Sequence, residues 1–259
     1  MAAVDEVPVP TPPEPPSALL PFREWTAVGM EVCAVVWFAV GFLLLPGLAA
    51  LAASRLGMPF ESAWVILIVQ TAGLLALPLL LRAFAPSWRA VAEHFRLGVW
   101  RGWWFGKGFL LAAALALLVA GVTVGWTAAL RCLRIPLEAR PPNQEVFFNG
   151  GESGRWLMTA AALLAAPLWE EMAFRNGLYG LLRRLVPSRS AAALTAVVFA
   201  SLHGSLIQFP GLVLLSLCWQ KVRVRTQSFW SSVMLHFYNN LFALLMMWAL
   251  LPGDGSGAA

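Results

Sequence analysis

The sequence predicts an all-α membrane protein, a polytopic bundle of about seven to eight transmembrane helices. Of its 259 residues, 59% are hydrophobic and only 12% are charged, whereas soluble domains carry about 25% charged residues. The chain also has 13 Trp, a residue type that concentrates at membrane interfaces. The chain has 18 Lys and Arg, and all but Arg175 lie outside the centres of the apolar runs, in short loops rather than on one soluble face, so a nucleic-acid partner is not expected.

Seven apolar runs are predicted as spans, because a spanning helix needs about 20 mostly apolar residues. They are Cys33–Ala53, Ala63–Leu81, Phe109–Leu130, Trp156–Leu182, Ala191–His203, Leu206–Trp219 and Phe229–Leu251. An eighth helix has room in either of two places. One is Arg82–Lys107, whose interleaved Arg and Trp are typical of an amphipathic segment in the headgroup region. The other is the polar loop Arg131–Arg155.

The ends of the chain differ in composition from the apolar middle. Residues 1–22 are rich in Pro and acidic side chains, which predicts a disordered N-terminal tail. Residues 23–252 are predicted to form the membrane-embedded domain, with the motif-bearing core at 156–251. Residues 253–259 are predicted to be a short flexible tail.

The distribution of charge predicts the orientation in the membrane, and the cysteine spacing bears on disulfides and metal binding. With seven spans, most Lys and Arg fall in the loops that lie on the same side of the membrane as the N-terminus. This bias predicts an integral, multi-pass protein with a cytoplasmic N-terminus, in the bacterial inner membrane. The three cysteines form no CxxC motif, so neither a disulfide framework nor a thiolate metal site is expected; they are Cys33, Cys132 and Cys218.

The segment Trp169–Arg175 places two adjacent carboxylates and a guanidinium at the end of an apolar run. Burying a charge in hydrocarbon costs several kcal/mol or more, so such residues are rare in spans and usually functional. On a helix, Glu171 and Arg175 share a face and can form an ion pair. Glu170 points roughly 100° away from Glu171. The pattern predicts a structural carboxylate, Glu171, beside a free carboxylate, Glu170, that can face a cavity.

Polar residues that do not belong in lipid occur on two further predicted spans. The fifth span ends at His203, and the seventh contains His236, Asn239 and Asn240. His236 and Asn240 are four residues apart and share a helix face. A carboxylate beside a histidine can activate a water, and two donors opposite it can stabilise an oxyanion. Together with Glu170, these residues predict hydrolysis of a peptide bond within the membrane.

Other uses of the same residues stay open. Glu170, His203 and His236 could bind zinc at tetrahedral geometry, but the chain has no HExxH motif, and no metal or other cofactor is expected. Ser201 and Ser205 flank His203, yet no GxSxG motif surrounds them, so a serine nucleophile is disfavoured. Taken alone, the Glu–Arg pair could be an ion pair that stabilises helix packing, and each histidine could be an ordinary core residue. Only their occurrence on three spans favours a site.

Three motifs in order carry a resemblance to a known family. They are Glu-Glu-x-x-x-Arg (Glu170, Glu171, Arg175), Phe-x-x-x-His (Phe199, His203) and His-x-x-x-Asn (His236, Asn240). This arrangement resembles the CPBP intramembrane proteases, which include CAAX-processing endopeptidases and the Abi group, and it covers roughly Trp156–Leu251.

The resemblance implies a CAAX-protease-like helix bundle and a glutamate-dependent intramembrane endopeptidase. Glu170 and His203 would activate water, and His236 and Asn240 would stabilise the oxyanion. Glu171, Arg175 and Phe199 would have supporting roles.

The expected partners are the lipid bilayer and a protein substrate with a C-terminal processing signal, with or without a lipid. The cleaved bond would lie near the substrate's C-terminus or in its membrane-embedded segment. Two alternatives stay open. One is a non-catalytic immunity or scaffold protein of the same fold. The other is a proton-coupled transporter, which the lack of repeated halves disfavours.

Overall fold

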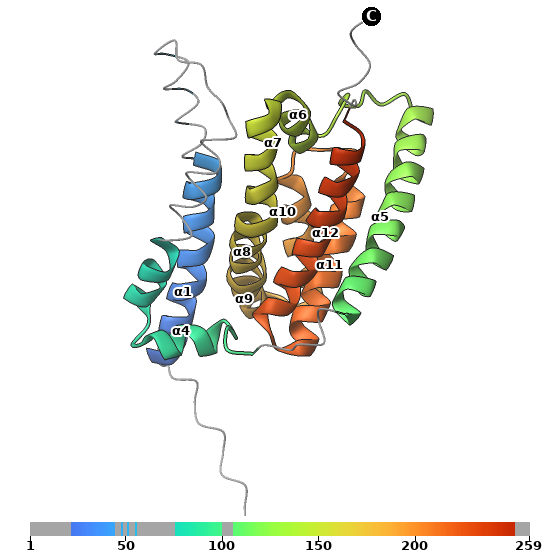
Figure 1. The fold of residues 1–259 in the computed structure, drawn as a ribbon. Coiled ribbons are helices and arrows are strands. Elements are labelled where there is room, and N and C mark those ends of the chain that lie inside the picture. Colours follow the sequence, from blue (N-terminus) through green and yellow to red (C-terminus); the bar gives the residue numbers. More distant parts are fainter. Residues whose placement is uncertain are drawn as a thin grey trace, which may run out of the picture.

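The computed structural model describes residues 22–44, 48, 51, 55, 76–99 and 106–251, and all regular structure within these ranges is helical (Figure 1). This agrees with the predicted all-α class. The tails predicted at 1–22 and 253–259 lie outside the described residues, except that the first helix begins at Phe22. Most of the second predicted span, Ala63–Leu81, also lies outside them, with residues 76–84 helical.

The described elements are helices and π-helical segments. In chain order they are α1 (Phe22–Phe38), the π-helical η1 (Ala39–Leu44), α4 (Trp88–His94), α5 (Lys107–Cys132), α6 (Pro142–Asn149), α7 (Gly151–Ala160), the π-helical η3 (Ala161–Ala165), α8 (Ala166–Glu170), the π-helical η4 (Glu171–Leu178), α9 (Tyr179–Leu185), α10 (Ser188–Ser201), α11 (Phe209–Thr226) and α12 (Phe229–Ala249).

Two helices among the described residues are long and apolar enough to cross a membrane. They are Lys107–Cys132 and the continuous helix Gly151–Leu185, which match the third and fourth predicted spans. Helix α5 also exposes large apolar side chains along its length, with Leu117 78% and Val124 70% exposed. Such a surface suits contact with lipid tails. Of the predicted seven to eight spans, these two meet the length and hydropathy criterion within the described part of the chain.

The loop predicted at Arg131–Arg155 is partly helical. Helix α5 extends to Cys132, α6 occupies Pro142–Asn149, and α7 already begins at Gly151. Pro142 stands in the first turn of α6, where its missing N–H has no helical partner to lose. Helix α4 forms within the predicted amphipathic segment, and the Ser87 hydroxyl caps it by accepting a hydrogen bond from the Ala90 N–H at 3.1 Å. Both places proposed for an additional helix therefore contain a short one, of 7 and 8 residues, which is too short to span a membrane, so an eighth span is not confirmed.

The helix Gly151–Leu185, made of α7, η3, α8, η4 and α9, is the centre of the bundle (Figure 1). Helices α1 and α10 both pack against η4 and α9, whereas α12 packs against η3, α8 and η4 of the same helix. Helix α11 contacts both α10 and α12, and α5 packs outside α11 and α12. The central helix therefore presents its residues to α1, α10 and α12 at once.

Pro167 accounts for part of the irregular backbone in this helix. A proline has no N–H to donate within a helix, and the residues just before it form the π-helical η3. There the Ala166 N–H reaches the carbonyl of Ala161, five residues back. The same spacing would pair the Ala162 carbonyl with residue 167, which has no N–H. The side chain of Asn240 on α12 takes this place and donates to the Ala162 carbonyl at 2.8 Å.

Helix α1 approaches the central helix closely at Gly177. A Cβ added there would lie 2.8 Å from Val35 Cγ2 and 3.1 Å from the carbonyl oxygen of Glu31. In a membrane, where apolar burial does not drive helix association, such close packing is a main source of stability. Glycine at this position therefore lets the two helices meet.

Gly177→Ala is expected to destabilise the protein by about 1–3 kcal/mol, the usual cost of overpacking. The measurement is the unfolding midpoint of the purified protein in detergent micelles. Gly125→Ala in α5 is the matched control, because a Cβ there meets no heavy atom within 4 Å and Ala favours a helix over Gly by about 1 kcal/mol. Equal midpoints for the two variants would contradict the packing of α1 on η4.

Candidate active site

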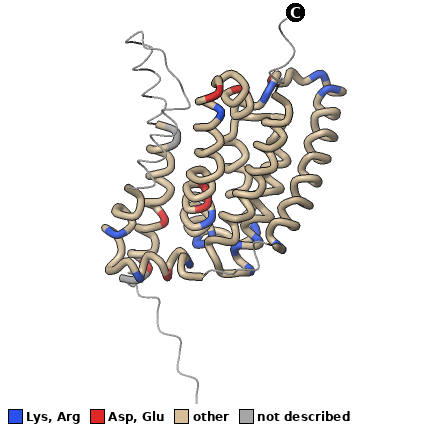
Figure 2. Tube along the Cα trace, in the orientation of Figure 1, with Lys and Arg blue, Asp and Glu red and all other residues tan. Residues whose placement is uncertain are grey.

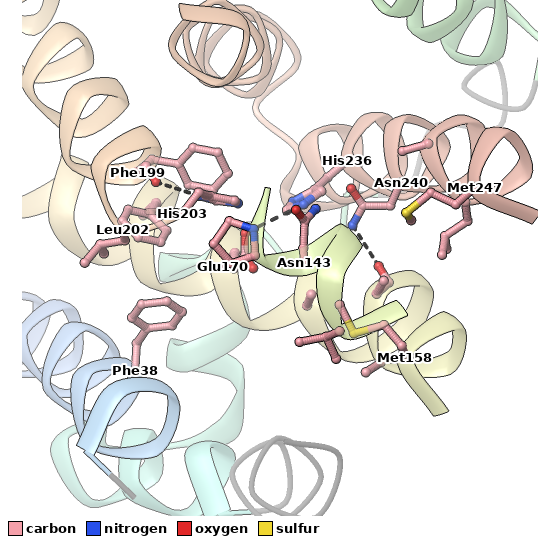
Figure 3. A pocket seen from close by; sticks show the side chains of 18 residues that line it. Phe38, Asn143, Met158, Glu170, Phe199, Leu202, His203, His236, Asn240 and Met247 are labelled. Atoms are coloured by element: carbon pink, nitrogen blue, oxygen red, sulfur yellow. Dashed lines mark hydrogen bonds and ion pairs between the residues drawn. The ribbon is translucent and has the colours of Figure 1, made fainter. Parts of the chain in front are cut away.

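A cavity of about 350 Å³ lies between the central helix, α6, the end of α10 and α12. Its walls are mostly apolar and include Phe38 from α1. Four of the predicted polar site residues line it, and Figure 3 shows their side chains around the same space: Glu170, His203, His236 and Asn240. Three helical segments separated in sequence thus meet at one cavity, as their polar residues predicted.

The two adjacent glutamates have different surroundings. Glu170 lines the cavity, and its Oε2 has no hydrogen-bond partner among the described residues. Its Oε2 lies 3.7 Å from His236 Nε2. Glu171 is fully buried and does not line the cavity. Glu170 is therefore the carboxylate available to a ligand in the cavity.

Glu171 forms a buried cluster behind the cavity. Its Oε2 lies 3.3 Å from Arg175 Nε, which is the ion pair predicted from their spacing. Its Oε1 lies 3.2 Å from His236 Nδ1. The Arg175 guanidinium also lies over the Phe199 ring, with 4.8 Å from Cζ to the ring centroid, a favourable cation–π arrangement. One carboxylate thus holds a cation from its own helix and a histidine from α12.

His236 is further oriented by Trp219 on α11. The two rings are stacked, with centroids 4.3 Å apart and 21° between their planes. Because Nδ1 faces Glu171 and one ring face is covered by Trp219, the Nε2 atom is the one directed towards Glu170. The ring is therefore held in one orientation before any substrate binds.

His203 lies in the turn after α10. Its Nδ1 is 2.8 Å from the Phe199 carbonyl oxygen, so Nδ1 carries a proton and donates it. In the neutral ring this leaves Nε2 as a proton acceptor. Phe199 also packs against the His203 ring, with centroids 4.7 Å apart. Phe199 therefore supports both His203 and Arg175, and in Figure 3 His203 and His236 lie on either side of Glu170.

Asn240 has its side-chain amide partly committed. One N–H donates to the Ala162 carbonyl at 2.8 Å, and Oδ1 accepts a hydrogen bond from Asn239 Nδ2 at 3.4 Å. An amide has two N–H donors, so one is left for the cavity that Asn240 lines. Asn240 thus joins α12 to the π-helical part of the central helix and keeps one donor free.

Two residues of the site were not identified from the sequence. Asn143 on α6 lines the cavity, and Figure 3 shows it close to His236. Its position in a polar loop before the central helix was the one available signal. Trp219 stacks on His236, but a Trp in an apolar run carries no sign of such a role.

The possible zinc ligands do not form a metal site in the structure. Within the described residues, no group of three or more His, Cys, Asp or Glu side chains is placed to hold a metal ion. Zinc needs four donors, of which the protein supplies at least three. Glu170, His203 and His236 share a cavity without forming such a group.

Comparison with known protein families finds a family whose sequence model matches part of the chain. Residues 152–242 match the sequence model of a family described as Type II CAAX prenyl endopeptidase Rce1-like. The matched region contains the central helix from its first turn, α10, α11 and the part of α12 that bears His236 and Asn240. No curated protein and no solved structure matched the chain. Over residues 152–242, the chain is similar to the Rce1-like CAAX endopeptidases, which supports the resemblance drawn from the three motifs.

Proposed function

We propose that the protein is an intramembrane endopeptidase that uses Glu170 as the base that activates a water. The observation that carries this proposal is the contrast between the two glutamates: Glu170 lines the cavity, whereas Glu171 does not line it and is paired with both Arg175 and His236. A base must reach the proton it abstracts, directly or through one water. Glu170 meets this condition and Glu171 does not. The match of residues 152–242 to the model of a protease family supports the same assignment.

In the proposed reaction, a water bound between Glu170 and His203 attacks the carbonyl carbon of the scissile peptide bond. Glu170 takes the proton from this water as the new carbon–oxygen bond forms. The C–N bond then breaks, and the proton passes to the leaving amine. His203 contributes its Nε2, because Nδ1 is committed to the Phe199 carbonyl.

The negative charge that develops on the carbonyl oxygen needs donors on the other side of the substrate. We place His236 Nε2 and the remaining Asn240 N–H in this role. Because Nδ1 donates to the Glu171 carboxylate, this role requires His236 in its doubly protonated form, in which both ring nitrogens are donors. Both side chains are held by contacts outside the cavity, His236 by Glu171 and Trp219, and Asn240 by the Ala162 carbonyl. Donors that are fixed in advance stabilise a developing oxyanion most effectively. Asn143 of α6 lines the same cavity, and we propose that it contacts the substrate.

The proposed substrate is a membrane-associated protein cleaved near its C-terminus or within its membrane segment. The cavity's largely apolar lining, with Phe38 and Met158 among its side chains, suits an apolar or lipid-modified peptide. Figure 2 shows that Lys and Arg gather at the end of the bundle that carries α4. By the positive-inside rule this end is cytoplasmic, so we propose a multi-pass inner-membrane protein with its N-terminus in the cytoplasm.

Glu170→Gln is expected to abolish cleavage, by at least about 100-fold, because general-base catalysis contributes 10²–10⁴-fold. Two measurements check this. One is hydrolysis of a farnesylated, fluorescence-quenched peptide ending in Cys-a-a-X, assayed with and without the lipid. The other compares the C-terminal peptides of membrane proteins in cells that produce the wild type or the variant. Equal processing by both proteins at equal abundance would rule out Glu170 as the base.

Glu171→Gln is the matched comparison, the same change at the adjacent position. It leaves the buried Arg175 guanidinium without its counterion, which costs about 3–5 kcal/mol. Its unfolding midpoint is therefore expected to fall well below that of Glu170→Gln, which should remain near the wild-type value. The reverse order would show that the roles of the two carboxylates are assigned the wrong way round.

We further propose that the reaction needs no bound metal. Elemental analysis of the purified, tag-free protein is expected to find no stoichiometric zinc, and a chelator should leave peptide hydrolysis unchanged. One zinc per chain that is lost in His203→Ala would instead assign Glu170, His203 and His236 as ligands.

A further inference from the structure

A second cavity, of about 560 Å³, lies at the α4 end of the bundle. It is bounded by α1, the turn after α4, the end of the central helix, and α11. It shares no lining residue with the candidate active site. Its lining is polar and basic, in agreement with the Lys and Arg that Figure 2 shows at this end.

The arginines of this cavity outnumber its carboxylates. Five arginines line it, and Glu31 is the one acidic side chain among the lining residues; the arginines are Arg96, Arg175, Arg183, Arg184 and Arg223. Glu31 is engaged by Arg184 through two contacts of 3.0 and 3.3 Å and lies 3.3 Å from His94 Nε2. Arg175 pairs with Glu171 behind the cavity. Positive charge thus remains without an acidic partner in the described part of the chain.

Arg223 is the clearest example of an arginine in this cavity that forms no ion pair in the described structure. It is 9% exposed, and its Nη2 donates to the Phe95 carbonyl at 3.1 Å and to Asn176 Oδ1 at 3.0 Å. Both partners are neutral, so neither compensates its charge. Burial and the positive charge of Arg96 lower the pKa of Arg223 to about 10, against the opposing effect of the Glu171 charge, which leaves it cationic at neutral pH. Arg223 is thus a buried cation whose direct hydrogen-bond partners are neutral.

The backbone around Arg96 holds this arrangement in place. Arg96 has a positive φ of 57°, a conformation that non-glycine residues adopt rarely and at some cost. The neighbouring carbonyls are used: Phe95 accepts from Arg223, and the Arg96 carbonyl accepts from the Phe229 N–H at 3.4 Å. The turn is therefore tied to both α11 and α12 and keeps Arg96 at the cavity.

Gln220 gives an independent indication of a ligand. It lines the cavity and is 3% exposed, yet neither its Nε2 nor its Oε1 has a hydrogen-bond partner in the described structure. The Nη1 and Nη2 of Arg175, which is 2% exposed, also lack hydrogen-bond partners there. Buried polar groups are nearly always hydrogen-bonded. These donors therefore point to a polar occupant that satisfies them.

We propose that this cavity is a binding site for a phosphate-class anion, either the headgroup of an anionic phospholipid or free inorganic phosphate. Guanidinium groups bind phosphate oxygens through paired, charge-assisted hydrogen bonds. Arg96, Arg183 and Arg223 would supply the charge, and Gln220 would add a neutral donor. Arg175 borders this site on one side and pairs with Glu171 on the other. The anion would therefore bind next to the cluster that orients His236.

The test uses the purified, delipidated full-length protein. One arm titrates inorganic phosphate by calorimetry. The other measures lipid binding by native mass spectrometry, with phosphatidylglycerol compared with zwitterionic phosphatidylcholine. Saturable binding of phosphate, or preferential binding of phosphatidylglycerol, supports the site, and the arm that responds identifies the source of the phosphate group.

Arg96→Ala combined with Arg183→Ala removes two exposed arginines of the cavity that have no ion-pair partner in the described structure. Binding is expected to weaken at least about 10-fold, since two charge-assisted contacts are lost. Arg189→Ala combined with Arg225→Ala is the matched control. It removes the same charge from exposed positions that do not line the cavity, and it should change affinity less than about twofold.

Gln220→Met separates binding from folding. Replacing an unpaired buried amide by an apolar side chain of similar size is expected to raise the unfolding midpoint of the ligand-free protein. The same change should reduce the additional increase in the unfolding midpoint that anion binding produces. The proposal is overturned if neither phosphate nor phosphatidylglycerol binds, or if the control pair weakens binding as much as Arg96→Ala with Arg183→Ala.

Discussion

The ion pair between Glu171 and Arg175 is the interaction on which the rest of the structure depends. Both side chains are buried, so neither charge can be left without the other. Glu171 uses its second oxygen to hold His236, and Arg175 lies over the ring of Phe199, whose carbonyl fixes His203. One buried pair thereby orients both histidines of the candidate active site. It also leaves Glu170, the next residue along the helix, free of a strong partner.

The irregular backbone of the central helix serves the same arrangement. Pro167 is followed within one turn by both glutamates, and π-helical segments lie on either side of α8. π-Helical segments are frequent at functional sites. Here the segment before Pro167 exposes the Ala162 carbonyl, and Asn240 uses it as an anchor. The side-chain geometry of the candidate site therefore follows partly from one residue that cannot donate a backbone hydrogen bond.

Local spacing in the sequence was enough to predict the Glu171–Arg175 pair and the shared face of His236 and Asn240, because both depend only on the helical repeat. The meeting of three helices at one cavity followed from their polar residues, which had few other reasons to lie in apolar runs. The stacking of Trp219 on His236 could not be predicted, since it depends on how α11 and α12 are rotated about their axes. The bond from Asn240 to Ala162 depends on local π-helical pairing, which sequence spacing does not reveal. The basic cavity combines residues from four separate segments.

The central claim is that Glu170 is reachable from the cavity while Glu171 is enclosed. Dicyclohexylcarbodiimide tests it most directly, because this small apolar reagent modifies carboxyl groups that it can reach from an apolar phase. The folded protein would be treated in detergent, digested, and sequenced across residues 170 and 171 by mass spectrometry. We expect modification at Glu170, lost in Glu170→Gln, and none at Glu171. Modification at Glu171 in the folded protein, or equal modification of both residues, would contradict the account.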